Sequence, residues 1–338
     1  MTEHQPKSPE PLGPRIVYRQ ATAPRRTNRE AALAGLEFLF ASREEGHWGD
    51  FSILGKGPEI WVTACCLTRL AEIPADSLSQ NFRVGMDESL DWLMGKRTPE
   101  GLWGADDDAE ADADTTAWAV VALRRLGRTP PPEALDFIRK CQRPNGGFAA
   151  YPETSQVDSL YKVSAPDTTV IALKALAVPN PAAEEFLATR LQTDTVGSWH
   201  RLASRFQLWS EMLDMEEGLV SWFLLNRVSQ STAQVPADNA FEQSLLLRCL
   251  FRLRMQRAWQ EAAALRGLQL ADGSWPGSAT LGPAMPGAVV RQKPHMQVKD
   301  DKRIITTVSA VSALVMGESQ PGLYFGSDLP QPRRLSES

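Results

Sequence analysis

Apolar residues recur along this chain at helical spacing, in segments that come in pairs. The first segment of a pair has one apolar side, and the second is apolar in nearly every register, as in residues 117–123 and 170–176. This pattern predicts a partly exposed helix followed by a buried helix. A turn with glycine and an aromatic residue ends the first helix in most of the pairs.

The pairs repeat through most of the chain, and four of them align by eye. Residues 181–253 are more diverged, and we interpret them as two further pairs. The pairs, each given as its first and second segment, are 32–51 with 59–70, 89–105 with 113–126, 134–151 with 166–176, 182–192 with 204–213, 217–228 with 239–253, and 259–278 with 303–314.

Six such pairs predict an all-α fold, an (α/α)6 double ring in which the buried helices form an inner barrel and the exposed helices an outer layer. One helix pair cannot bury its apolar face alone, and closure of the ring removes the exposed ends of an open stack. We therefore expect one domain at residues 29–318 of the 338, with an arm at 1–28 and a tail at 319–338.

The turns carry glycine where a helix end favours a left-handed residue, and a large aromatic side chain follows. We expect these aromatic residues to pack each turn against the next helix rather than to touch a ligand. The glycines are Gly46, Gly101, Gly146, Gly147 and Gly273, and the aromatic residues are Trp48, Trp103, Phe148 and Trp275.

Composition narrows the class of protein. A net charge of −5 and a pI near 5.6 argue against a nucleic-acid-binding protein, which needs a dense basic face. The spacing of Cys65, Cys66, Cys141 and Cys249 fits neither a disulfide framework nor a zinc site, so we expect a cytoplasmic protein. The N-terminus has no apolar signal core, and the apolar segments are too short to span a membrane.

Two carboxylates stand at the start of one buried segment. Asp112 and Asp114 are the last charged residues before the apolar run 117–123. Desolvation raises the pKa of an Asp, and a second Asp two residues away raises it further. One of the pair can therefore keep a proton near neutral pH, as a general acid requires.

The same residue types also serve as helix caps, which gives a second interpretation. Residues 167–169 repeat the Asp-Thr-Thr of residues 114–116 one pair later. We interpret Asp167 mainly as a cap, with a place in a cavity as the alternative, and we count it among the candidate substrate-binding residues. Asp112 and Asp114 differ, because one cap is enough and a second carboxylate adds only repulsion.

These features together resemble one family. The glycine and aromatic turns resemble the QW-type repeats of the squalene and terpene cyclase superfamily, and residues 112–117 resemble the Asp-x-Asp-Asp-Thr-Ala acid motif of class II cyclases. The likeness extends over nearly the whole chain. Thr115 replaces the third Asp, so the chain is similar to the Asp-x-Asp-Thr-Thr variant of drimane-type sesquiterpene cyclases.

This resemblance implies a cyclisation that begins with protonation. Class II cyclases protonate a terminal alkene or epoxide, and the middle Asp of the motif, which corresponds to Asp114, is the acid. Asp112 and Thr115 correspond to the flanking motif positions and are expected in the catalytic group. The expected reaction converts farnesyl diphosphate to a bicyclic drimane-type product with the diphosphate retained. Some relatives carry a fused phosphatase domain, so we expect a separate phosphatase as partner.

A carbocation cascade needs walls that stabilise positive charge without reacting, and aromatic faces do this. Trp118 lies one helical turn after Asp114 on the same face, where the first cation would form. Trp61 and Trp209 stand in early turns of other buried segments. We expect these three tryptophans to contact the substrate.

A diphosphate needs positive charge near the mouth of the barrel. We expect Lys302 and Arg303, which precede the last buried segment, to bind it. The acidic run 106–110 is an alternative place for Mg²⁺ with the diphosphate, although we assign no metal ligands. His200 and His295 are candidates for the terminating base, with water as the alternative.

Other functions stay open at this point. The substrate alternatives are geranylgeranyl diphosphate and other isoprenoids. A non-catalytic barrel that binds a lipid or a partner is the alternative from another class, and a zinc-dependent prenyltransferase subunit shares the double ring. A homodimer, or membrane contact through residues 217–225, would each explain an apolar outer helix.

Overall fold

The computed structural model describes residues 26–52, 57–157, 159–193, 205–215, 220–232, 236–281 and 298–318, and every structural statement concerns these. The outer helices are α1 (Asn28–Ala41), α3 (Gln80–Gly95), α5 (Pro132–Lys140), α7 (Pro181–Thr193), α9 (Trp222–Thr232) and α11 (Ala258–Gly267). The inner helices are α2 (Glu59–Leu70), α4 (Ala113–Arg125), α6 (Pro166–Leu176), α8 (Arg205–Leu213), α10 (Ala240–Arg252) and α13 (Ile304–Glu318). The short elements are η1 (Ala75–Ser77), η2 (Ser159–Lys162), β1 (Thr280–Leu281) and β2 (Val298–Lys299).

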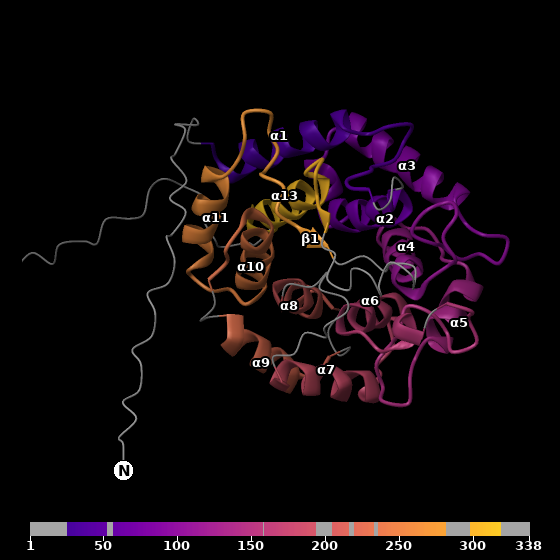
Figure 1. The fold of residues 1–338 in the computed structure, drawn as a ribbon. Coiled ribbons are helices and arrows are strands. Elements are labelled where there is room, and N and C mark those ends of the chain that lie inside the picture. The colour runs from indigo at the N-terminus through magenta and orange to yellow at the C-terminus, as the bar shows by residue number, and fades with distance from the viewer. Residues whose placement is uncertain are drawn as a thin grey trace, which may run out of the picture.

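The inner helices form a closed ring. Each inner helix contacts the next in chain order from α2 to α13, and α13 contacts α2. Each outer helix packs on the inner helix that precedes it, and α1, which has none before it, packs on α13. Figure 1 shows the two layers, with the outer helices around the inner ones. The predicted (α/α)6 double ring of six helix pairs is confirmed.

The turns pack as expected. Glycine has a positive φ of 88°, 80°, 86° and 89° at Gly46, Gly101, Gly146 and Gly273. The aromatic side chain that follows each of them is fully buried. The indole N–H groups of Trp48, Trp103 and Trp275 donate to a carbonyl near the end of the preceding outer helix, at 2.7–2.8 Å. Gly147 is not left-handed; a side chain there would clash with Ser164 and Phe186 instead.

The turns also set the register of the inner helices. The backbone N–H of each turn aromatic residue donates to a threonine hydroxyl in the following inner helix, at 2.9–3.2 Å. These threonines are Thr63, Thr116, Thr169 and Thr307. The second threonine of each Asp-Thr-Thr run therefore has a structural role, and the same hydrogen bond recurs around the ring.

Two buried carboxyl groups lie where the last helix pair meets the first; Asp50 joins the two pairs, and Asp300 holds the last pair together. Asp50 Oδ2 accepts from the N–H of Ile305 at 2.8 Å, and Asp300 accepts from the N–H groups of Ala279 and Thr306. Burial raises the pKa of Asp50 to about 6. Burial and the charge of Asp50 raise the pKa of Asp300 to about 7.

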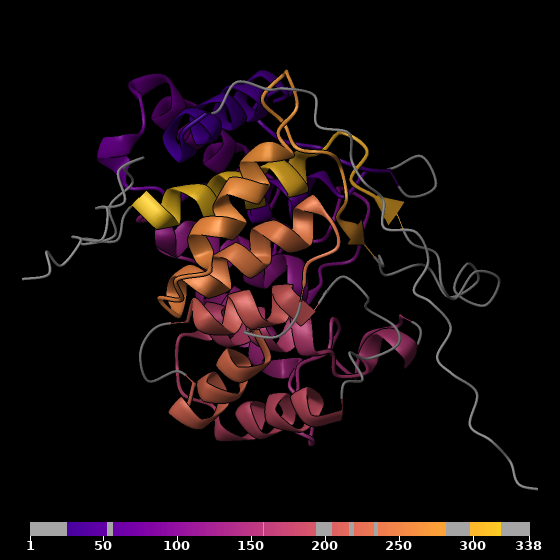
Figure 2. The ribbon, with the colours of Figure 1, turned by 90° about the vertical axis from the view of Figure 1, so that its left-hand side faces the viewer.

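The β1–β2 ribbon, which no sequence pattern predicts, lies close to this junction, since Asp300 directly follows β2. The two strands pair antiparallel, with Thr280 opposite Lys299. Their arrows lie at one end of the ring in Figure 2.

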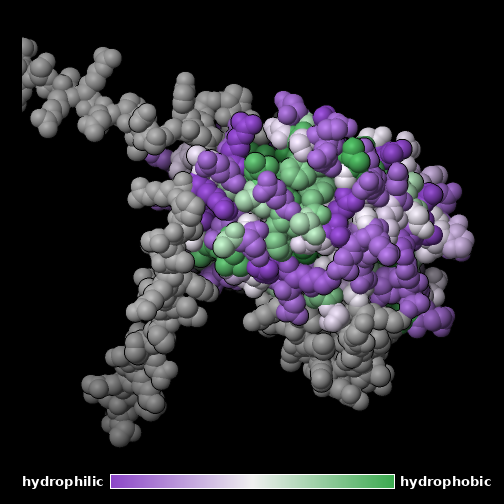
Figure 3. Space-filling model, turned by 90° about the horizontal axis from the view of Figure 1, so that it is seen from above, coloured by the Kyte–Doolittle hydropathy of each residue, from purple (hydrophilic) through white to green (hydrophobic). Residues whose placement is uncertain are grey.

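No helix in the described part of the chain is long and apolar enough to cross a membrane. Figure 3 shows hydrophobic surface among hydrophilic residues on the face that carries α1, where Leu33 is 48% exposed and Val84 of α3 44%. Within the segment 217–225, Val220 and Leu224 are buried in the core. Packing in the ring accounts for these two apolar side chains.

Candidate active site

Equivalent positions of three inner helices converge at one end of the barrel. The residues two positions before Thr63, Thr116 and Thr169 are Trp61 on α2, Asp114 on α4 and Asp167 on α6. Because the turn bonds hold the helices in register, these side chains face the same space. All three line one pocket inside the ring.

The pocket lies among four neighbouring inner helices. The free space within it is about 10 Å³, enough for one water molecule. Its wall comes from Trp61 of α2, from Asp114 and Trp118 of α4, from Asp167, Val170 and Ile171 of α6, and from Gln207, Leu208 and Glu211 of α8. Aromatic and aliphatic side chains therefore enclose three carboxyl groups.

Asp114 has the properties of a proton donor. Its side chain lies in the first turn of α4, and the indole N–H of Trp61 donates to its Oδ2 at 2.9 Å. Burial raises the pKa of Asp114 well above its ordinary value, and the charges of Asp167 and then Asp112 raise it further. The Trp61 bond opposes the rise, because a donor stabilises the ionised form. The net effect raises the pKa of Asp114 and so favours the protonated form of the carboxyl group.

Asp112 caps the helix. Its Oδ1 accepts from the N–H of Thr115 and its Oδ2 from the Thr115 hydroxyl, both at 2.8 Å. Burial raises the pKa of Asp112 to about 6, and the bonds from Thr115 oppose this. Neither Asp112 nor Thr115 belongs to the pocket wall. The structure thus places these two predicted catalytic residues behind Asp114, where they position the first turn of α4.

Asp167 is not a helix cap, so our favoured interpretation of it is wrong. Ala165 occupies the N-cap position of α6, where no side chain caps the helix. Asp167 lies in the first turn and lines the pocket, as the cavity alternative stated. The reason is the register set by Thr169, which turns residue 167 to the inside of the ring.

Two of the three predicted tryptophans lie in the pocket wall. Trp61 and Trp118 meet edge to face, with ring centroids 6.4 Å apart. Trp209 is buried but does not line the pocket, because α8 turns Gln207, Leu208 and Glu211 toward it. Trp209 packs edge to face on Phe206 instead, at 5.5 Å.

The predicted diphosphate ligands are engaged elsewhere. Lys302 pairs with Glu44 at 3.1 Å, and Arg303 pairs with Asp272 at 3.0 Å. Neither cation lines the pocket. The acidic run 106–110 does not converge, since Asp107 pairs with Lys96 and Glu110 accepts from Ser155. His200 and His295 lie outside the described residues.

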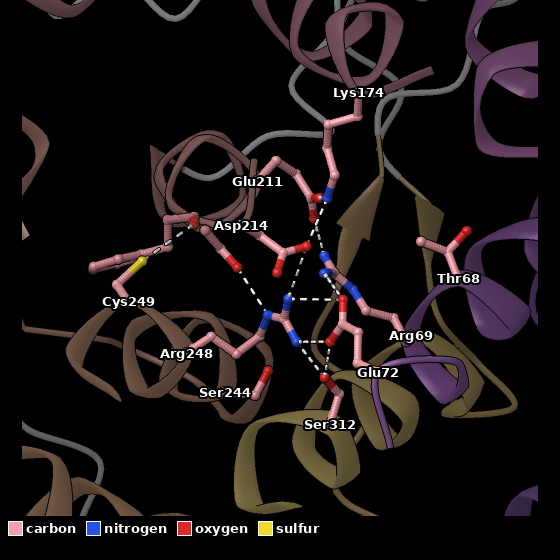
Figure 4. Close-up of polar contacts among 12 residues, drawn as sticks. Thr68, Arg69, Glu72, Lys174, Glu211, Asp214, Ser244, Arg248, Cys249 and Ser312 are labelled. Atoms are coloured by element: carbon pink, nitrogen blue, oxygen red, sulfur yellow. Dashed lines mark hydrogen bonds and ion pairs between the residues drawn. The ribbon is translucent and has the colours of Figure 1, made fainter. Parts of the chain in front are cut away.

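A network of buried charges lies on the floor of the pocket, and sequence reasoning missed it (Figure 4). Glu211 pairs with Arg69 of α2 and, at 2.6 Å, with Lys174 of α6. Every inner helix contributes, through Arg69, Glu72, Arg125, Lys174, Ser210, Glu211, Asp214, Arg248, Arg252 and Ser312. The available signal was the presence of charged residues inside apolar segments, which structures bury only when they are paired.

The network lies at the C-terminal ends of the inner helices, opposite Asp114. Arg69 and Lys174 stand in the last turns of α2 and α6, and Arg125 ends α4. Their positive charges lie where the helix dipoles are negative, and Arg125 also donates to the carbonyl of Thr68 at 3.0 Å. The barrel is therefore closed at this end by ion pairs.

No family model matches the chain, and no curated protein matches it. Solved structures do match. A protein from Actinoplanes has a TM-score of 0.70 and 18% identity over 86% of this chain and 99% of its own. Type II terpene cyclase MstE from Scytonema has a TM-score of 0.66 and 20% identity, over 85% of this chain and 97% of its own. An ent-copalyl diphosphate synthase from Streptomyces platensis has a TM-score of 0.51 and 18% identity, over 77% of this chain and 50% of its own.

At these identities the likeness establishes the fold alone, an α/α barrel of the kind that terpene cyclases have. One variant of MstE holds geranylgeranyl dihydroxybenzoate, its substrate, at a TM-score of 0.65 and 18% identity over 85% and 96% of the two chains.

Proposed function

We propose that the chain is a class II terpene cyclase, in which Asp114 starts the reaction by protonating a terminal alkene. The observation that carries the proposal is a buried carboxyl group with a raised pKa in a pocket walled by two tryptophans. Asp114 is held by Trp61 and lies beside Trp118, in a barrel of the kind that terpene cyclases have. The raised pKa of Asp114 gives it the proton that such a start requires.

The geometry suggests which oxygen carries the proton. An indole N–H can only donate, so Oδ2 of Asp114, which accepts from Trp61, acts as the carbonyl oxygen of the acid. The proton then resides on Oδ1. Asp112 and Thr115 support this arrangement by fixing the first turn of α4.

The reaction is an isomerisation when it ends by loss of a proton, and a hydration when water captures the last cation. The π electrons of the terminal alkene form a C–H bond with the proton of Asp114, which leaves a carboxylate on the protein and a tertiary cation on the substrate. The next alkene attacks this cation to form a C–C bond, and a second attack closes the second ring. Loss of a proton to a base forms the final alkene, or water captures the cation. The diphosphate or other head group is kept.

The faces of Trp61 and Trp118 suit the intermediate cations. Aromatic faces stabilise positive charge by about 2 kcal/mol when water is excluded, and they donate no lone pair that would end the cascade. Trp118 lies 3% exposed, one turn deeper than Asp114. It is therefore placed to receive the charge after the first ring has formed.

Substrate binding requires the pocket to open. Sites for molecules of drug size are roughly 300–1,000 Å³, whereas this pocket has about 10 Å³ of free space. We propose that the wall residues of the four helices move apart when a linear isoprenoid enters.

Farnesyl diphosphate stays our proposed substrate, with a bicyclic drimane-type product, and a separate phosphatase would then act on that product. The MstE complex supports a second test substrate, a geranylgeranyl chain on an aromatic head. The described acidic residues form no cluster of three or more suited to hold a metal ion. In this proposal Mg²⁺ only helps to anchor the diphosphate, because protonation by Asp114 starts the reaction.

The test is an incubation of the purified protein with farnesyl diphosphate, geranylgeranyl diphosphate and geranylgeranyl dihydroxybenzoate, with cyclic products measured by mass-detected chromatography. We expect a cyclic product from one of them and a loss of at least about 10³-fold in Asp114→Asn. Asp107→Asn is the matched control, since Asp107 is 65% exposed and pairs with Lys96 outside the pocket. Equal activity in wild type and Asp114→Asn would refute the proposal.

A further inference from the structure

Glu211 brings an ionised carboxylate into the same pocket as the proposed acid. It lines the pocket, and its side chain is only 4% exposed. Arg69 and Lys174, its two partners, are absent from the pocket wall. Figure 4 shows both cations converging on this carboxylate. Of these ion pairs only the carboxylate lines the pocket, while the Arg69 guanidinium lies against the ring of Trp118.

Glu211 lies deeper in the barrel than Asp114. Asp114 bonds to Trp61 near the start of α2, whereas Glu211 pairs with Arg69, which follows Trp61 by eight residues on the same helix. At a rise of 1.5 Å per residue, this separates the two contacts by about 12 Å along the helix. Trp118 follows Asp114 by one turn of α4, and its ring centroid is 5.8 Å from the Arg69 guanidinium. Trp118 therefore lies between the two contacts.

This order has a consequence for a cation in the pocket. After proton transfer Asp114 is a carboxylate next to the new cation, and it is the nearest base that could take the proton back. A second fixed negative charge deeper in the pocket gives positive charge a favourable position away from Asp114. The aromatic face of Trp118 lies on the way to that position.

Glu211 is also unsuited to quench the cation. Oε1 accepts from Arg69, and Oε2 accepts from Lys174 at 2.6 Å. The two cations hold the pKa of Glu211 below its usual range, against the effect of burial. A carboxylate of low basicity with both oxygens hydrogen-bonded is a weak base and a weak nucleophile.

The cations behind Glu211 do not cancel its effect on the pocket. The network holds five cations, Arg69, Arg125, Lys174, Arg248 and Arg252, against the carboxylates Glu72, Glu211 and Asp214. The dipole of each inner helix also places about half a negative charge at its C-terminal end, on this side of the barrel. These helix ends offset the excess of cations, and the group nearest to the pocket is the carboxylate.

We infer that Glu211 and Trp118 form a subsite for positive charge at the floor of the pocket, which holds the cation formed by ring closure. This inference rests on the proposed function for its role in catalysis. The subsite itself is defined by its ligand class, a prenyl chain with a cationic carbon or a cationic stand-in.

Binding tests the subsite without any reaction. The probes are a farnesyl-length tertiary amine, which is protonated at neutral pH, and its uncharged carbon isostere. We expect wild type to bind the ammonium at least about tenfold more tightly than the isostere, and Glu211→Gln to lose this preference. Asp214→Asn is the control, because Asp214 pairs with Lys174 and Arg125 but does not line the pocket. It should keep the preference.

The products give a second readout. Glu211→Gln should release more singly cyclised product, because the second cation loses its stabilisation, whereas Asp214→Asn should lower the melting temperature and leave the product ratio unchanged. If Glu211→Gln does not fold, Glu211→Gln with Lys174→Met removes one of the two cations facing the lost carboxylate and serves in its place. An unchanged ammonium preference in the Glu211 variants overturns the inference. Absence of any cyclic product from wild type overturns only the proposed function.

Discussion

The indole nitrogen of Trp61 lies 2.9 Å from Oδ2 of Asp114 and so fixes the orientation of the proposed acid. The same bond stabilises the ionised carboxylate, whereas burial and the charge of Asp167 stabilise the neutral acid. The pKa of Asp114 is the balance of these effects. A substitution can remove the bond from Trp61 or the charge of Asp167 separately. The first should raise the pKa of Asp114, and the second should lower it.

Trp61→Phe should raise the pKa of Asp114, because the bond that favours the carboxylate is lost. Cyclisation needs the protonated acid, which is present below the pKa and disappears as the pH rises through it. The alkaline limb of kcat/KM should therefore move to higher pH, while kcat falls about 10²-fold through lost orientation. Trp209→Phe is the control, since Trp209 does not line the pocket, and it should leave the limb in place.

Asp167→Asn should have the opposite effect on the pH profile. Asp167 is the charged neighbour that raises the pKa of Asp114 most. Its removal lowers that pKa, so activity should disappear at lower pH than in wild type. Asp112→Asn should shift the limb in the same direction by less. A limb that moves to higher pH in Asp167→Asn would show that the two groups do not interact in this way.

Of the two threonines after Asp114, we expect Thr115 to position Asp112 and Thr116 to stabilise the fold. Thr116 accepts from the N–H of Trp103 and donates to its carbonyl, which also accepts from the N–H of Asp112. Thr116→Val therefore leaves the buried N–H of Trp103 without a partner and should cost about 2 kcal/mol. Thr115→Val removes a donor to Asp112, which should raise the pKa of Asp112 above about 6. Urea unfolding and the pH profile measure the two effects. Equal losses of stability in both variants would contradict the assignment.

Two left-handed glycines test how closely the outer layer packs. Gly127 has φ 74° and open space where a Cβ would lie, whereas a Cβ on Gly146, at φ 86°, would lie 2.0 Å from the carbonyl oxygen of Ala182. Gly127→Ala should therefore cost only the backbone strain, about 1–2 kcal/mol. Gly146→Ala should cost clearly more, because the start of α7 has to move. Chemical denaturation of the two variants gives the comparison.

Much of the fold could be predicted because the repeat is local. Glycine and an aromatic residue mark the turn in four of the six pairs, and apolar spacing separates inner from outer helices, so the ring follows from the sequence. The bond from Ile305 to Asp50 that closes the ring could not be predicted, because it joins residues about 250 positions apart. The β1–β2 ribbon is too short to leave a pattern.

The site could be predicted only in part. Asp114, Trp61 and Trp118 were found because they lie at helix starts that repeat. Asp167 was misinterpreted as a cap because residue type alone does not give the helix register, which a threonine in the next turn sets. For the same reason, residue type did not show that Trp209 lies outside the pocket wall. Glu211 was missed because its place in the pocket depends on ion pairs with two other helices.

The central claim is that the reaction starts with a proton from Asp114, and the deuterium content of the product tests it most directly. The cyclisation is run in D₂O, where the carboxyl group of Asp114 exchanges its proton, and the product is weighed by mass spectrometry. The account predicts one non-exchangeable deuterium in each molecule of product, and no product from Asp114→Asn. A cyclic product without deuterium would contradict the account, because it would mean that the cation arises without protonation.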